Sequence, residues 1–142
     1  MLPDNPFTNV IGIGVDIVEI ARIQRIIERT GERFLRKVFT ANERTYCASK
    51  RRPWESYAGR FAAKEAVLKA IGTGLTAGAA LADVEILRTE NGAPLVQLHH
   101  KTYLLAQERG IQHILLTLAH DGNQAIAIAM AVVITPEVPT NE

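Results

Sequence analysis

The sequence predicts an α+β fold, in which antiparallel hairpins lie beside a block of helices. After one early strand, the chain shows helical periodicity up to residue 71, whereas the second half shows short alternating runs around two turn signals. Turns of this kind join antiparallel strands. Hairpins beside a helical block favour α+β over a doubly wound parallel sheet.

Composition indicates one globular domain. The 142 residues are 47% hydrophobic and 22% charged, and we expect a single domain over 1–142 with loose tails at 1–9 and 135–142. A net charge of +1 gives no case for nucleic acid. The single cysteine, Cys47, excludes an internal disulfide and fits a reducing compartment. Without a signal-peptide pattern or an apolar run of about 18–20 residues, we expect a cytoplasmic protein without a membrane partner.

The first predicted strand, residues 10–18, carries two glycines. Its apolar residues alternate onto one face, and Gly12, Gly14 and Asp16 fall on the other. Glycines weaken a strand, so their presence indicates that another part of the molecule approaches closely. Asp16 would point into the space beside them, although capping the next helix is an alternative role.

Four helical patterns follow, at 19–30, around 33–38, at 41–49 and at 54–71. The third begins at a capping box, Thr40 to Glu43. The segment 22–52 holds ten basic and only three acidic residues, which indicates an anionic partner. Within it, a basic ridge of three arginines recurs on one side of the first helix: Arg22, Arg25 and Arg29.

The stretch 59–74, GRFAAKEAVLKAIGTG, combines an alanine-rich face with charged residues. Alanines allow another backbone to approach a helix closely. Glu65 has three cations near it in sequence, Arg60, Lys64 and Lys69, and helix spacing predicts that they cluster. An ordinary surface helix with ion pairs is the alternative. The triplet Gly72-Thr73-Gly74 ends the helix and could offer backbone N–H donors.

The second half of the chain predicts a strand at 82–88, a return strand at 95–98, a helix at 100–109 and a hairpin of strands 113–119 and 125–134. The last strand presents only alanines on one face (residues 125, 127, 129 and 131). We expect that face to pack tightly against a helix or another subunit.

Asp16 and Glu65 suit a hard divalent ion such as Mg²⁺, which completes its coordination with water and substrate phosphates. The neighbouring cations would bind those phosphates. His120 ends a predicted strand and is a candidate base, proton carrier or substrate contact, or simply a structural residue. These features suggest phosphoryl or nucleotide-diphosphate chemistry. A Mg²⁺-dependent hydrolase and a non-enzymatic binder of acidic partners are the alternatives.

Two stretches, GIGVDIVEIARI (12–23) and GRFAAKEAVLKAIGTG (59–74), resemble the holo-[acyl-carrier-protein] synthase group of 4′-phosphopantetheinyl transferases. The likeness covers roughly residues 10–134, and the length is similar to the small bacterial type. The resemblance implies a 4′-phosphopantetheinyl transferase-like fold, with an antiparallel sheet, a long packed helix and a helical N-terminal block. It also implies transfer of the phosphopantetheine arm of coenzyme A (CoA) to a serine of an apo acyl carrier protein. Adenosine 3′,5′-bisphosphate would be released, and fatty acid biosynthesis would be supported.

The resemblance also implies residue roles. Asp16 and Glu65 would hold Mg²⁺, which also binds the CoA diphosphate. Arg60, Lys64 and Lys69 would lie near the CoA phosphates, and Gly72, Thr73 and Gly74 near the nucleotide. The catalytic set would be Glu65, His120 and Lys69, with Glu65, His120 or a metal-bound water as base. Ala119 departs from the Ser or Thr that family members often carry before the histidine, which leaves the role of His120 open.

Small members of the family form trimers with sites between neighbouring subunits, so we expect a homotrimer. Acyl carrier proteins resemble acidic helical bundles. The ridge of Arg22, Arg25 and Arg29 would therefore dock a partner of opposite charge. The choice among fatty acid, polyketide and peptide synthetase carriers stays open.

Overall fold

The computed structural model describes residues 9–72 and 78–134. In chain order its elements are β1 (Val10–Glu19), α1 (Ile20–Thr30), α2 (Glu32–Val38), α3 (Ala41–Ala48), α4 (Pro53–Ile71), a 3₁₀ turn η1 (Leu81–Asp83), β2 (Val84–Arg88), β3 (Pro94–Leu98), α5 (His100–Glu108), β4 (His113–Asp121) and β5 (Gln124–Val132). The strands form two antiparallel sheets, ordered β1-β5-β4 and β2-β3. The α+β prediction is confirmed. The predicted tails lie outside the described residues, apart from residue 9.

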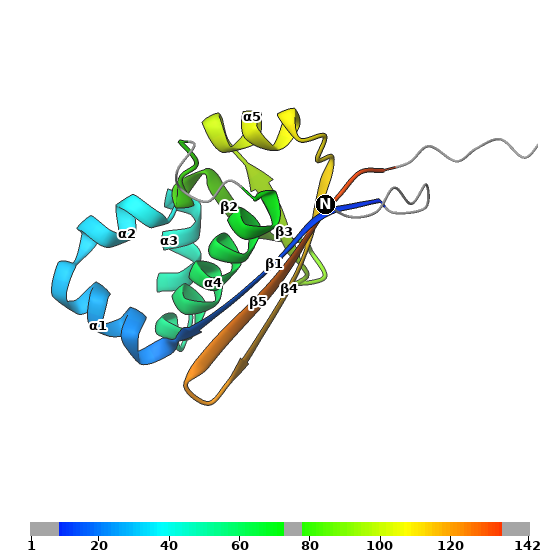
Figure 1. The fold of residues 1–142 in the computed structure, drawn as a ribbon. Helices are drawn as coiled ribbons and strands as arrows, with labels where there is room; N and C mark the ends of the chain where they lie inside the picture. Colours follow the sequence, from blue (N-terminus) through cyan, green and yellow to red (C-terminus); the bar gives the residue numbers. More distant parts are fainter. Residues whose placement is uncertain (1–8, 73–77, 135–142) are drawn as a thin grey trace, which may run out of the picture.

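Helix α4 lies between the helical block and the three-stranded sheet (Figure 1). On its sheet side its backbone touches β1 at the two glycines. A Cβ atom placed on Gly12 would lie 2.0 Å from the carbonyl oxygen of Ala70, and one on Gly14 would lie 1.9 Å from that of Ala66. The close approach inferred from the glycines is therefore confirmed, and the approaching element is α4.

The alanine face of β5 packs on the same helix. All four alanines of that face are at most 1% exposed, and α4 contacts β5 directly. Of the two partners considered for this face, a helix or another subunit, the structure shows the helix within the same chain.

The opposite face of the sheet is apolar and exposed in the single chain. Ile13, Val15 and Ile17 on β1 are 62%, 51% and 57% exposed. Ile13 pairs with Met130 on β5, which pairs in turn with Leu115 on β4, so the apolar face continues across all three strands. The alternation predicted for β1 is present, but Ile13, Val15 and Ile17 point away from the core toward solvent.

The helical block follows its sequence patterns closely. Ile20, Ile23 and Ile27 bury the apolar stripe of α1. At the start of α3 the capping box is present, since the Thr40 hydroxyl accepts from the Glu43 backbone N–H and the Glu43 carboxylate accepts from the Thr40 backbone N–H. These local signals set the helix boundaries to within about two residues of those expected.

Replacing Gly14 by alanine should destabilise the protein by about 3 kcal/mol or more, because the new methyl group would overlap the backbone of α4. Gly59 gives a matched control, since it lies in α4 and a Cβ added there would meet nothing within 4 Å. Gly59→Ala should raise stability by up to about 1 kcal/mol through helix propensity. Urea unfolding of both variants measures the difference, and equal stabilities would contradict the contact.

Candidate active site

A charged cluster forms where β1 meets α4. Asp16 projects from the glycine-bearing face of β1, and Lys69 reaches it from α4. The Lys69 ammonium donates to Asp16 Oδ1 at 3.2 Å and to the Val15 carbonyl at 2.9 Å. Glu65 lies one helical turn before Lys69, and its interaction with Asp16 is repulsive. The structure thus brings Asp16, Glu65 and Lys69 together.

The two carboxylates of this cluster repel each other. Burial raises the pKa of Glu65 above its ordinary value of 4.5, the charge of Asp16 raises it further, and Lys69 partly opposes both. The described residues hold no group of three or more His, Cys, Asp or Glu side chains suited to a metal. A pair of carboxylates fits Mg²⁺, which keeps several waters and accepts phosphate oxygens. Lys69 places one positive charge beside Asp16. A bound Mg²⁺ ion would further relieve the repulsion between Asp16 and Glu65.

Lys64 does not belong to this cluster, and its predicted role as a phosphate ligand was wrong. Its side chain is 0% exposed, and its ammonium donates to Glu43 Oε1 at 2.6 Å and to the carbonyls of Leu81 and Val84 at 3.2 and 2.6 Å. Those three acceptors occupy all three of its N–H groups. Burial lowers the pKa of Lys64, which its partner Glu43 opposes. Lys64 therefore ties α4 to the helical block and β2.

The sequence held a signal for this burial. Lys64 stands in a helical stripe with Phe61, Leu68 and Ile71, at spacings of three and four residues. A lysine inside an apolar stripe predicts a buried position. Its partner Glu43 lies 21 residues earlier, and no local rule joins the two.

Arg60, one helical turn before Lys64, is also buried, at 3% exposed. One of its terminal nitrogens, Nη1, donates to Ser56 Oγ at 3.1 Å, and Nε has no partner among the described residues. It lines a basic pocket of about 550 Å³. The other residues around this pocket are Tyr46, Lys50, Arg51, Arg52, Glu55, Ser56, Gly59, Arg88, Leu118, Ala119, His120 and Ala125. A buried guanidinium with an unpaired donor at a basic pocket suits an anionic ligand.

His120 lines the same basic pocket and is 61% exposed, with Nε2 3.6 Å from Glu55 Oε2. Its strand β4 and the Asp16 strand β1 form opposite edges of the sheet, with β5 between them. Within one chain, His120 therefore lies two strands away from Asp16. Sequence reasoning missed Tyr46 and Arg88, and counted Lys50, Arg51 and Arg52 only within the basic segment 22–52.

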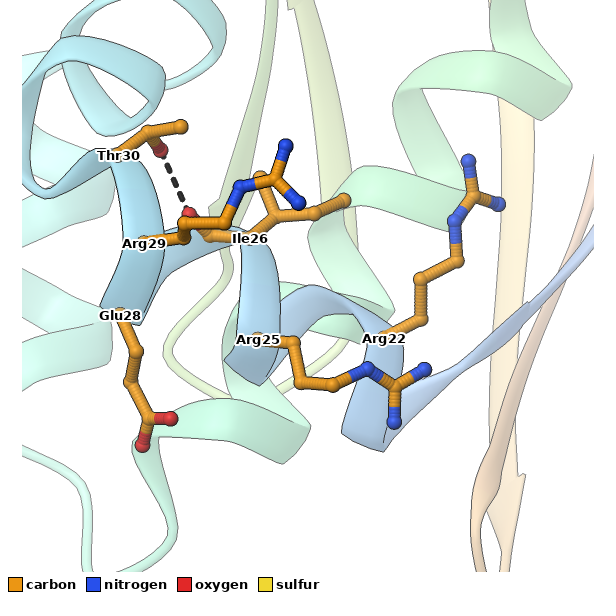
Figure 2. Close-up of a pocket in the computed structure, with 6 residues that line it drawn as sticks. All are labelled: Arg22, Arg25, Ile26, Glu28, Arg29 and Thr30. Carbon is orange, nitrogen blue, oxygen red and sulfur yellow. Dashed lines mark hydrogen bonds between the residues drawn. The ribbon is translucent and has the colours of Figure 1, made fainter.

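The arginine ridge predicted on α1 is present. Figure 2 shows Arg22, Arg25 and Arg29 leaving the helix toward one side, with Glu28 pointing away. All three are exposed and line a hollow of about 570 Å³ with Ile26, Glu28 and Thr30. Among the described residues, Arg25 forms one ion pair, a long one of 3.5 Å to Glu19. This side of α1 can therefore receive negative charge.

Gly72 ends α4 in the left-handed conformation, with φ of 88°, as expected for a helix stop. Its N–H donates to the Leu68 carbonyl at 3.0 Å. That bond corrects the idea that Gly72 offers a free N–H donor to a nucleotide. Thr73 and Gly74 lie outside the described residues.

None of the helices in the described parts of the chain is long and apolar enough to cross a bilayer.

The family model of the 4′-phosphopantetheinyl transferase superfamily matches residues 12–129, which include Asp16, Glu65, Lys69 and His120. The chain belongs to this superfamily. It is 49% identical over 123 residues to a holo-[acyl-carrier-protein] synthase of Desulforudis audaxviator, covering 87% of this chain and 93% of that protein. A Protochlamydia amoebophila protein of the same name is 47% identical over 120 residues, covering 84% and 96%.

Solved structures of the superfamily share the fold. The holo-[acyl-carrier-protein] synthase of Neisseria meningitidis matches with a TM-score of 0.80 at 30% identity, covering 86% of this chain and 98% of that one. The Helicobacter pylori synthase, solved in complex with coenzyme A, matches with a TM-score of 0.74 at 33% identity, covering 84% and 98%. The fold predicted from the family motifs is thus confirmed.

Without metal, Glu65→Gln should unfold at a higher temperature than the parent protein at pH 7. Because the pKa of Glu65 is raised in the folded state, its stabilising contribution is complete below the unfolded value and is lost as pH rises through the folded value. Glutamine carries no charge and avoids that loss. Since solvent screens this half-buried group, we expect about 2 °C.

The gain should shrink toward nothing below about pH 4, where Glu65 is largely protonated in both the folded and the unfolded state. Calorimetry in a chelator at both pH values tests this. A lower melting temperature for Glu65→Gln at pH 7 would show that the carboxylate is stabilised where it lies.

Proposed function

We propose that this protein transfers the 4′-phosphopantetheine group of CoA to a serine of an apo acyl carrier protein and releases adenosine 3′,5′-bisphosphate. The observation that carries the proposal is the Asp16–Glu65–Lys69 cluster, within a chain 49% identical to a holo-[acyl-carrier-protein] synthase. A pair of repelling carboxylates beside a lysine suits a bound cation and a diphosphate. The enzyme would act in the cytoplasm as a single domain and would support fatty acid biosynthesis.

Asp16 and Glu65 would hold Mg²⁺, and the ion would supply positive charge for the CoA diphosphate. The serine oxygen would bond to the phosphorus that bears pantetheine, and the bond from that phosphorus to the bridging oxygen would break. Lys69 can turn from Asp16 toward the charge that grows on the departing phosphate. Glu65, His120 or a metal-bound water would accept the serine proton.

The two clusters of this chain suggest how CoA would lie. Its diphosphate suits the carboxylate cluster with Mg²⁺. The basic pocket of Arg60 and His120 holds one carboxylate, Glu55, among its cations and suits a phosphate without metal, which in CoA is the 3′-phosphate. Because small members of the superfamily form trimers with sites between neighbouring subunits, one CoA would contact two copies of the chain.

A homotrimer would supply that arrangement. The exposed rows of Ile13, Val15, Ile17 and Ile128 offer an apolar face that a second copy could cover. This face, rather than the buried alanine face of β5, supports the interface. Sedimentation equilibrium should give three times the chain mass, and a monomer at micromolar concentration would remove the proposal of a shared site.

The transfer itself is tested with CoA, Mg²⁺ and an apo carrier protein, by following carrier mass. The carrier should gain one phosphopantetheine. Chelation of the metal or the change Asp16→Asn should lower the rate by about 100-fold or more, because a metal ion contributes several kcal/mol of charge stabilisation. CoA breakdown without carrier would support a hydrolase instead. Carrier binding without chemistry would support a non-enzymatic binder.

The side of α1 bearing Arg22, Arg25 and Arg29 would dock the acidic carrier protein. Arg22→Glu should raise KM for the carrier about tenfold while KM for CoA stays within about twofold, because like charges then meet at the interface. Arg33→Glu makes the same charge change on α2, outside this hollow, and serves as control. Equal losses in both variants would mean that general charge, and not this ridge, attracts the carrier.

A further inference from the structure

Three cations of the basic pocket converge on one aromatic ring. The guanidinium carbon of Arg60 lies 4.1 Å from the centroid of the Tyr46 ring, Lys50 Nζ lies 4.3 Å from it, and the guanidinium carbon of Arg88 lies 5.8 Å from it. These residues come from α4, the segment after α3 and the end of β2. Tyr46, on α3, is the residue that all three contact.

The cations of this pocket are held in two different ways. Glu55 pairs with Arg52 at 3.3 Å and lies 3.6 Å from His120. For Arg60, Lys50 and Arg88, no ion pair to a carboxylate occurs within the described residues. A cation within about 6 Å of a tyrosine ring is attracted by the negative face of the ring. The Tyr46 ring therefore takes the position beside these three cations that a carboxylate would otherwise occupy.

This difference matters for ligand binding. A carboxylate partner would neutralise a cation and compete with an incoming phosphate. An aromatic face fixes the direction of a cation and leaves its full charge for the ligand. Burial alone would raise the pKa of the Tyr46 phenol, but a hydrogen bond from Lys50 and the charges of Arg88, Lys50 and Arg60 lower it. The pocket thus has a strong positive potential at Tyr46.

We propose that Tyr46 is a positioning residue, whose ring holds Arg60, Lys50 and Arg88 in place to bind the 3′-phosphate of CoA. The inference rests on the proposed function, in which this pocket takes that phosphate. Tyr46 acts through the cations and touches neither the diphosphate nor the reacting serine. It therefore sets the preference for CoA over dephospho-CoA, which lacks the 3′-phosphate, and leaves the chemical step unchanged.

The test compares kcat and KM for CoA and dephospho-CoA, with a carrier protein as acceptor. In Tyr46→Leu, KM for CoA should rise about tenfold, the loss of two or three cation–π contacts. Its kcat and its KM for dephospho-CoA should stay within about twofold of the parent values. Tyr46→Phe, which keeps the ring, should restore KM for CoA. Tyr103→Leu makes the same change at an exposed tyrosine on α5 and should alter neither KM.

Several results would overturn the inference. An equal rise in both KM values would mean that the ring contacts the base or the pantetheine arm. A Tyr46→Phe variant as weak as Tyr46→Leu would assign the effect to the hydroxyl group. A fall in kcat together with a lower melting temperature would indicate a purely structural role.

Direct binding separates this inference from the proposed function. Calorimetric titration with adenosine 3′,5′-bisphosphate and with adenosine 5′-phosphate needs no carrier and no turnover. In Tyr46→Leu only the bisphosphate should lose affinity, about tenfold. If the parent protein transfers no phosphopantetheine but this selective loss occurs, the proposed function fails and the role of Tyr46 stands. If transfer occurs and the selective loss is absent, only the role of Tyr46 fails.

Discussion

The backbone contact between α4 and β1 is the constraint on which the rest of the structure depends. Gly12 and Gly14 leave no side chain where β1 crosses α4, and Ala66 and Ala70 present only backbone and methyl groups from α4. Two glycines cost strand stability. However, these glycines let α4 pack directly against the backbone of β1, and this packing brings Asp16 close to Lys69 and Glu65. The site geometry is therefore a direct result of the packing that excludes side chains.

The same packing divides the charges of the molecule. On the β1 edge, two carboxylates share one exposed lysine, and the site attracts cations. On the β4 edge, the basic pocket collects cations around Tyr46 and Arg60 and attracts anions. The sheet order β1-β5-β4 places β5 between the strands that carry Asp16 and His120. A ligand with both a metal-binding diphosphate and a separate phosphate matches this division.

Sequence reasoning succeeded where the determining contacts are local or follow from missing side chains. Helix boundaries, the capping box at Thr40, both hairpins and the close approach at Gly12 and Gly14 all belong to this group.

Sequence reasoning failed where the interaction partner of a residue lies far along the chain. Placing Lys64 with Arg60 on one helix face is correct geometry. The partners that hold Lys64 in the core are tertiary neighbours: Glu43 and the carbonyls of Leu81 and Val84. The pairing of β1 with β5 and the meeting of Arg88 with Tyr46 also follow only from the folded topology, because no periodicity along the chain encodes them. The sequence could therefore suggest the members of the carboxylate cluster, whereas the basic pocket required the structure.

Lys64 and Glu65 are neighbours in the chain, but their side chains leave α4 in different directions. Lys64 is anchored in the core by a buried ion pair and two carbonyls, and Glu65 faces Asp16. Any rotation of α4 that moved Glu65 away from Asp16 would pull a charged amine from all of its partners. Local opening of the carboxylate cluster is thus coupled to opening of the core. The backbone that carries Glu65 therefore opens only together with the core of the protein.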